Sequence, residues 1–188
     1  ITNRFIYLEE GDVAEICNDQ FQIYNEADLP VQRPIQVSQL SANAIERGSY
    51  KHYMLKEIFE QPQAIANTIE GNIDHEKGVI HLTEIEKSFP SLKNLQRISI
   101  VACGTARHAA LVGKYYIEQF ARIPVDVDFG SEFRYRDPIL DKNSLTVLIS
   151  QSGETADTLA ALRESSSKNV LTLSVCNVRE SSLTRESD

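Results

Sequence analysis

Two stretches of the sequence decide the fold: Arg97-Ile98-Ser99-Ile100-Val101-Ala102-Cys103-Gly104-Thr105, and Leu145-Thr146-Val147-Leu148-Ile149-Ser150-Gln151-Ser152-Gly153-Glu154-Thr155. Each is a short apolar run followed at once by a polar turn that contains glycine. Around them, strand and helix patterns alternate: strands are expected at residues 97–102, 125–129, 145–149 and 170–175, and helices at 106–121, 131–135 and 155–167. Such alternation predicts an α/β domain, with a doubly wound parallel sheet flanked by helices.

The two polar turns are expected to form a ligand site. In a doubly wound sheet with the flavodoxin-like strand order, ligands bind beyond the carboxyl ends of strands one and three. Those are the strands that end in Cys103-Gly104-Thr105 and in residues 150–155. Gly104 allows close approach of the backbone, and each turn brings free N–H groups and a helix dipole to the same place. We therefore expect an anion to bind there.

The composition of the turns narrows the anion. Neither turn contains the GxxxxGK[ST] lysine or the GxGxxG pattern of nucleotide sites, so a single phosphate held by hydroxyl and N–H groups is favoured. Ordinary helix capping explains Thr105 equally well, whereas four polar side chains within residues 150–155 exceed what capping needs. Glu154 would repel a phosphate unless it points away, and could bond a sugar hydroxyl or cap a helix.

Composition excludes several other classes of site. The formal net charge is −8 and the pI is near 5.1, which argues against a broad nucleic-acid surface. The three cysteines and four histidines lack metal-ligand spacing, so no metal and no cofactor are predicted. Unpaired cysteines fit a reducing, cytoplasmic location. The apolar runs are far shorter than the roughly 20 residues that cross a bilayer, so no membrane contact is expected.

The first 42 residues form a different kind of unit. Residues 4–8 and 20–24 alternate as strands do, with a turn signal at Gly11-Asp12, and we interpret them as the β-rich end of a preceding domain. A linker is expected at 43–51 and the α/β unit at 52–188, opening with a helix that Pro62 ends and a further helical segment at 64–69. Because the chain starts without Met and stops within a polar stretch after a predicted strand, we expect it to be part of a longer protein.

Taken together, the motifs resemble the sugar isomerase (SIS) domain, and more narrowly the glutamine:fructose-6-phosphate aminotransferase family of glucosamine-6-phosphate synthases. Ser150 to Thr158 resembles the phosphate loop of that family, and Ala102-Cys103-Gly104-Thr105 resembles its first turn. The stretches at 56–62 and 181–188 resemble the flanking segments, and residues 1–42 resemble the end of the family's glutaminase domain. The resemblance covers nearly the whole chain.

The resemblance implies that the full-length protein makes glucosamine 6-phosphate and glutamate from fructose 6-phosphate and glutamine, and that it forms a homodimer through its isomerase region. Matching positions imply phosphate contacts from one set of polar residues and support from a second set: Thr105, Ser150, Gln151, Ser152 and Thr155, supported by Cys103, Gly104 and Gly153. No catalytic residue is expected in this chain, because the family's catalytic groups lie before Ile1 and after Asp188. The chain alone should therefore be inactive.

Two points remain open at this stage. The family usually has Ser after Cys-Gly-Thr, where this chain has Ala106, so one hydroxyl contact to phosphate is missing and binding should weaken modestly, by roughly 0.5–1.5 kcal/mol. The alternative function is a non-catalytic SIS module that senses a sugar phosphate. A sensor would more often carry a DNA-binding helix-turn-helix before the α/β unit than glutaminase-like strands.

Overall fold

The computed structural model describes residues 3–18, 20–37, 47–82, 85–86 and 92–188. The chain divides into two compact units, Ile1–Ile69 and Glu70–Asp188. The expected linker at 43–51 lies partly outside the described residues, and the expected domain boundaries stay a prediction.

The first unit begins with antiparallel strands. The strand β1 (Arg4–Ile6) pairs with β5 (Ile35–Val37), and β3 (Gln20–Tyr24) pairs on its two sides with β2 (Val13–Cys17) and β4 (Pro30–Val31). The predicted β-rich N-terminal region is therefore confirmed.

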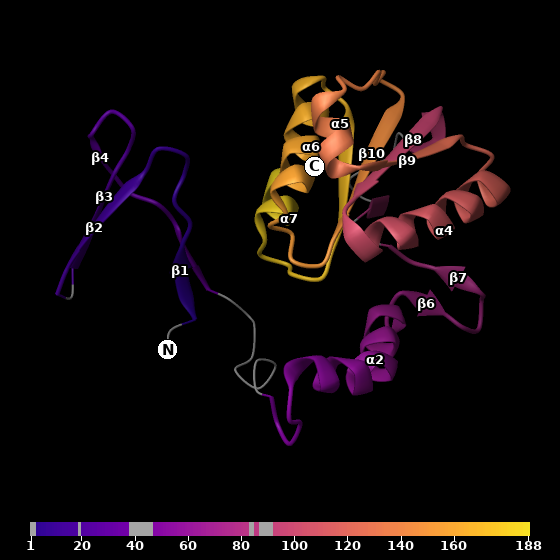
Figure 1. The fold of residues 1–188 in the computed structure, drawn as a ribbon, viewed down its shortest axis with the longest axis horizontal. Coiled ribbons are helices and arrows are strands. Elements are labelled where there is room, and N and C mark those ends of the chain that lie inside the picture. Colours follow the sequence, from indigo (N-terminus) through magenta and orange to yellow (C-terminus); the bar gives the residue numbers. More distant parts are fainter. Residues whose placement is uncertain (1–2, 19, 38–46, 83–84, 87–91) are drawn as a thin grey trace. The chain divides into compact units, whose positions relative to one another are not determined.

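The second part of this unit is the helix α2 (Tyr53–Ile69), which corrects one expectation. Pro62 was expected to end a helix, but it lies inside α2, which continues for seven more residues, to Ile69. Proline removes one N–H from the ladder and crowds the carbonyl four residues earlier, which bends a helix without necessarily ending it. The axis of α2 changes direction part-way along its length (Figure 1).

The second unit is built on a four-stranded parallel sheet. Its strands are β8 (Arg97–Ala102), β9 (Val125–Phe129), β10 (Ser144–Ser150) and β11 (Leu171–Cys176), in the order β11-β10-β8-β9. Every neighbouring pair is parallel. In chain order this is 2-1-3-4, the flavodoxin-like order, and strand order reverses between β8 and β10. The expected fold is confirmed. A short hairpin, β6 (Ile73–Asp74) with β7 (Val79–Ile80), and the 3-10 turn η1 (Leu92–Asn94) precede the sheet.

Helices cover both faces of the sheet (Figure 1). On one face α5 (Gly130–Tyr135), α6 (Ala156–Ser167) and α7 (Ser182–Glu186) supply buried side chains, which pack with Val101 and Leu148. On the other face α4 (Gly104–Phe120) supplies Ala110, which packs with Ile98 and Ile100. The alternation of side chains along β8 explains this division, since neighbouring residues of a strand point to opposite faces.

The apolar face predicted on α4 is not the face that packs on the sheet. The sequence pattern places Ala109, Val112, Tyr116 and Phe120 on one face, yet these side chains are exposed, with Phe120 exposed to 75%. The helix packs instead through Ala110 and the partly buried Ile117. The helix thus carries two apolar faces, and its periodicity alone cannot tell which of them meets the sheet.

Candidate functional site

A pocket of about 330 Å³ lies at the carboxyl ends of β8 and β10. All five predicted ligand-binding side chains line it, together with Cys103 and Gly104: Thr105, Ser150, Gln151, Ser152 and Thr155. Gly153 does not line the pocket, and it lies against Ser181 and Cys176 instead. The fold therefore brings together two turns that lie some 45 residues apart in the sequence, as the strand order requires.

The first turn is already helical. The helix α4 begins at Gly104, two residues earlier than the pattern predicts, and Cys103 is its N-cap residue without a side-chain cap bond. The first N–H groups of a helix have no carbonyl partner within it, so those of Gly104, Thr105 and Ala106 remain available to a ligand. Gly104 has φ +57°, and a Cβ at this position would meet no atom within 4 Å, which makes its backbone conformation the reason for glycine.

The second turn, residues 150–155, is held by its own side chains and is called the 150–155 loop from here on. The buried Ser150 hydroxyl accepts a hydrogen bond from the Gly153 N–H at 3.0 Å, and the Ser152 hydroxyl accepts one from the Glu154 N–H at 3.2 Å. Thr155 is the N-cap residue of α6 but makes no side-chain cap bond. The hydroxyl of Thr155 is therefore not occupied by capping, whereas that of Ser150 also shapes the loop.

Gly153 is required where it stands. Its φ is +68°, and a Cβ there would lie 2.0 Å from Ser181 Oγ and 2.8 Å from Cys176 Sγ. Positive φ costs an ordinary residue about 1–2 kcal/mol, and the contact distances exclude any side chain without movement of the neighbours. The segment after β11 thus packs directly against the back of the 150–155 loop.

Glu154 points away from the pocket. Its Oε1 accepts a hydrogen bond from the Ser182 N–H at 2.7 Å, at the first residue of α7. Of the two roles that the sequence left open, the structure shows capping. This orientation also removes the carboxylate from the place where it would repel a bound anion.

The attraction for an anion comes from dipoles. Among the described residues of this unit, no Lys or Arg lines the pocket. Arg134 pairs with Asp157 at 3.5 Å and Arg136 with Asp128 at 2.8 Å, and neither arginine lines the pocket. Helix N-termini at α4 and α6 and the loop hydroxyls supply the positive ends of dipoles instead, which suits one phosphate group.

Two residues at or beside the pocket were not predicted from the sequence. Thr158, which is buried, lines the pocket and lies with its Oγ1 3.8 Å from Cys103 Sγ. Cys176 ends β11, and its thiol lies 3.7 Å from the Gln151 carbonyl oxygen and 3.4 Å from Ser181 Oγ. Thr158 could have been found from its position on the buried face of the helix expected at 155–167. No local pattern identifies Cys176, because its contact with Gln151 comes from the distant 150–155 loop.

The helix α7 is tied to α6 by an ion pair that should make it sensitive to acid. Arg163 contacts Glu186 through two hydrogen bonds of 2.8 and 2.9 Å, and these hold the pKa of Glu186 below its ordinary value of 4.5. A lowered pKa in the folded state means that the pair stabilises fully above pH 4.5 and that this contribution disappears as pH falls through the lowered pKa.

We therefore expect Arg163→Gln to lower the thermal unfolding midpoint slightly at pH 6, by the equivalent of no more than about 1 kcal/mol, because the pair is largely exposed. The difference from the unsubstituted protein should shrink toward pH 3. A difference that stays constant from pH 6 to pH 3 in thermal unfolding followed by circular dichroism would contradict this assignment.

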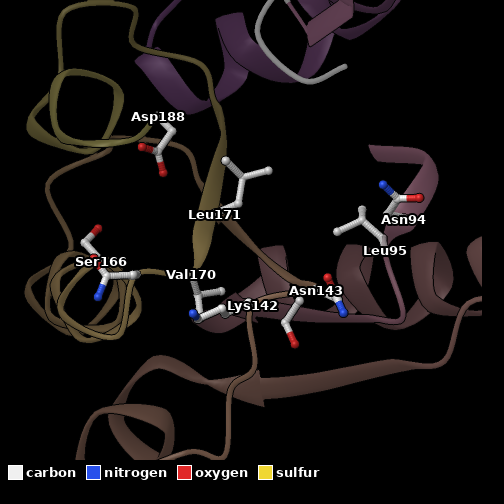
Figure 2. A pocket seen from close by; sticks show the side chains of 10 residues that line it. Asn94, Leu95, Lys142, Asn143, Ser166, Val170, Leu171 and Asp188 are labelled. Atoms are coloured by element: carbon white, nitrogen blue, oxygen red, sulfur yellow. The ribbon is translucent and has the colours of Figure 1, made fainter. Parts of the chain in front are cut away.

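A second and larger pocket, of about 450 Å³, lies near the amino ends of β10 and β11 (Figure 2). Figure 2 shows Asn94 and Leu95 on one side of it and Ser166 on the other. The carboxylate of Asp188 is engaged there by the N–H and hydroxyl of Thr172, at 3.0 and 2.8 Å. None of the predicted ligand residues lines this pocket, and ligands of doubly wound sheets bind at the opposite strand ends, so we assign the site to the smaller pocket.

Among the residues that the structure describes, no group of three or more His, Cys, Asp or Glu side chains is placed to hold a metal ion. Within the same residues, no helix combines the length and the apolar character needed to cross a membrane.

The chain is similar in sequence to known proteins along nearly all of its length. The sequence model of the SIS domain family matches residues 91–188 of this chain. The glutamine–fructose-6-phosphate aminotransferase [isomerizing] of Yersinia pseudotuberculosis is 48% identical over 190 aligned residues, which cover 100% of this chain and 31% of that protein. That of Chlorobaculum tepidum is 44% identical over 185 residues, covering 98% and 30%.

A solved structure agrees with the sequence matches. The C-terminal domain of glucosamine-fructose-6-phosphate aminotransferase from Francisella tularensis superposes with a TM-score of 0.68 at 48% identity, covering 76% of this chain and 40% of that one. The chain thus spans about 30% of the length of these curated aminotransferases and matches them along nearly all of its own length. Because the SIS model matches more than half of the chain and the strand order agrees with it, the chain belongs to the SIS domain family.

Proposed function

We propose that this chain is a segment of a glutamine–fructose-6-phosphate aminotransferase and that it holds the phosphate of fructose 6-phosphate, or of the product glucosamine 6-phosphate. The observation that carries the proposal is the pocket at the carboxyl ends of β8 and β10, where five polar side chains and the N-terminus of α4 converge. A phosphate there would accept hydrogen bonds from hydroxyl and backbone N–H groups.

The proposal assigns binding to this chain and chemistry to other residues. The pocket supplies donors for a phosphate, and we assign none of its residues to proton transfer or to covalent attack. The thiol of Cys103 lines the pocket and lies beside the Thr158 hydroxyl, a group that does not activate a thiol as a base would. We propose that the transfer of ammonia from glutamine and the isomerisation of the sugar use residues outside this chain.

The experiment that tests the function uses the complete protein encoded by the gene. Purified protein is mixed with fructose 6-phosphate and glutamine, and glucosamine 6-phosphate and glutamate are measured. Equal amounts of the two products support the proposal. Tight binding of fructose 6-phosphate without turnover would favour the sugar-phosphate sensor, and neither binding nor turnover would overturn both functions.

The similarity of the N-terminal residues favours the enzyme over the sensor. The match to the aminotransferases extends across the whole chain, including residues 1–90, which precede the SIS match. A sensor that shared only the α/β unit would not be expected to retain this similarity before it.

Ala106 offers a prediction about affinity. It lines the pocket in the first turn of α4, where a hydroxyl could reach a bound phosphate. Ala106→Ser should therefore strengthen binding of fructose 6-phosphate by roughly 0.5–1.5 kcal/mol, or about two- to tenfold. Titration calorimetry on the complete protein measures this. An unchanged or lower affinity would mean that the side chain of residue 106 does not face the phosphate.

We also propose that the protein forms a homodimer through the exposed face of α4. Val112, Tyr115, Tyr116 and Phe120 are each more than half exposed, and the rings of Tyr116 and Phe120 stack with their centroids 6.2 Å apart. Apolar groups of this size gathered on one helix face are typical of an interface.

The prediction is that the complete protein sediments as a dimer and that Tyr116→Ser combined with Phe120→Ser shifts it to the monomer. Tyr135→Ser on α5, where the side chain is 77% exposed, is the matched control and should leave the dimer intact. Analytical ultracentrifugation over a range of concentrations gives the mass. A dimer that survives the double substitution places the interface elsewhere.

Finally, we propose a cytoplasmic location. The support is that Cys17, Cys103 and Cys176 are free thiols, as expected in a reducing compartment.

A further inference from the structure

The 150–155 loop is anchored from behind by α7. The Ser182 N–H donates to Glu154 Oε1 at 2.7 Å, and the Leu183 N–H donates to the Gly153 carbonyl oxygen at 3.0 Å. Ser181 is the N-cap residue of α7, but its own hydroxyl makes no cap bond. Glu154 therefore satisfies the helix end from another segment, in place of the usual N-cap side chain.

The anchor is itself fixed to the core. The side chain of Leu183 is fully buried and packs with Val101, Leu148 and Leu162. Glu186, one turn later, pairs with Arg163 of α6. A displacement of α7 would therefore disturb a packed core, so α7 offers the loop a rigid support.

The direction of the Glu154 side chain decides the charge that a ligand meets. A carboxylate turned into the pocket would repel a phosphate, whereas the bond to Ser182 holds it on the far side of the loop. One hydrogen bond thus has two effects: it fixes the loop that carries Ser152 and Thr155, and it keeps a negative charge out of the pocket.

We propose that Glu154 is a positioning residue, which acts through α7 to hold the 150–155 loop in its anion-binding shape. This inference rests on the proposed function for the identity of the ligand. It does not need Glu154 to touch that ligand.

The test compares two substitutions in the complete protein. Glu154→Ala removes the acceptor for the Ser182 N–H, whereas Glu154→Gln keeps an oxygen acceptor of the same reach and removes only the charge. We expect Glu154→Ala to raise the Kd for fructose 6-phosphate about tenfold, as for the loss of a hydrogen bond to a charged group, and Glu154→Gln to restore most of the affinity. In turnover, KM should rise in Glu154→Ala with little change in kcat. Glu76→Ala, at an exposed carboxylate elsewhere in the unit, controls for the loss of charge.

Amide hydrogen exchange tests the contact between α7 and the 150–155 loop without any ligand. In Glu154→Ala the amides of Gly153, Ser182 and Leu183 should exchange faster, and in Glu154→Gln they should keep most of their protection. If the unsubstituted protein fails to bind fructose 6-phosphate, the proposed function fails, while exchange still tests the positioning role. Unchanged exchange in Glu154→Ala overturns the inference.

The binding data can overturn it in two further ways. If Ala and Gln substitutions both tighten binding, the carboxylate acts only by repulsion. If both weaken it equally, the negative charge itself, and not the acceptor, is what the site requires.

Discussion

Replacing Ser152 and Thr155 together by alanine is expected to abolish measurable binding of fructose 6-phosphate by the complete protein, while its thermal unfolding stays nearly unchanged. Both side chains line the pocket. A hydrogen bond to a charged group contributes about 1.5–3 kcal/mol, so the loss of two should lower the affinity by two orders of magnitude or more. Titration calorimetry and a thermal melt on the same sample measure the two effects.

The effect on stability should be small because the two hydroxyls make few hydrogen bonds within the protein. Ser152 accepts one exposed hydrogen bond from the Glu154 N–H, and Thr155 makes no side-chain cap bond. Ser166→Ala, at the other end of α6, is the matched control and should leave binding intact. Ser150→Ala should instead lower both binding and stability, since its buried hydroxyl holds Gly153. Unaltered affinity in the double variant would mean that the phosphate site is wrongly placed.

Gly153→Ala is expected to lower both ligand binding and stability, the second large effect. Positive φ costs about 1–2 kcal/mol for alanine, and overpacking costs typically about 1–3 kcal/mol more. The new Cβ would lie 2.0 Å from Ser181 Oγ, so either the loop or the start of α7 must move. Because the loop carries the phosphate donors, affinity should fall at least about a hundredfold, by the loss of two charged hydrogen bonds. Denaturant unfolding and titration calorimetry provide the two measurements.

Two variants separate the causes of this effect. Gly113→Ala, inside α4, meets no atom within 4 Å and should stabilise the protein by about 0.5–1 kcal/mol without changing affinity. Adding Ser181→Gly to Gly153→Ala removes the closest clash and should recover part of the loss, but not all, because Cys176 Sγ and the positive φ remain. A Gly153→Ala protein that binds normally would show that the back of the loop is not packed as described.

Much of the second unit could be predicted because its signals are local. The runs at 97–102 and 145–149 carry the apolar residues of buried strands, and each is followed by a turn whose glycine has positive φ. The alternation of strands and helices then predicts parallel strand pairs, whereas the order of the sheet depends on pairing between distant segments, such as Ser144 with Arg97. The convergence of Thr105 with the 150–155 loop then follows from strand order.

Errors arose where a local signal had more than one structural outcome. Pro62 indicates either the end of a helix or a bend within it, and the continuing helical residues up to Ile69 favour the bend. Gly104 and Thr105 were predicted to precede the helix, but they form the first turn of α4. A sequence pattern locates the start of a helix only to within one or two residues.

The sequence by itself determined the α/β class and the two polar turns, because each depends on residues close together in the chain. Only the tertiary structure decided which face of α4 meets the sheet and which way Glu154 points. It also showed that Ser181 leaves no room for a side chain at residue 153. Those outcomes depend on contacts with segments far along the chain: the sheet for α4, and Ser181 to Leu183 for the loop. Periodicity and turn chemistry carry no information about such partners until the fold has brought them together.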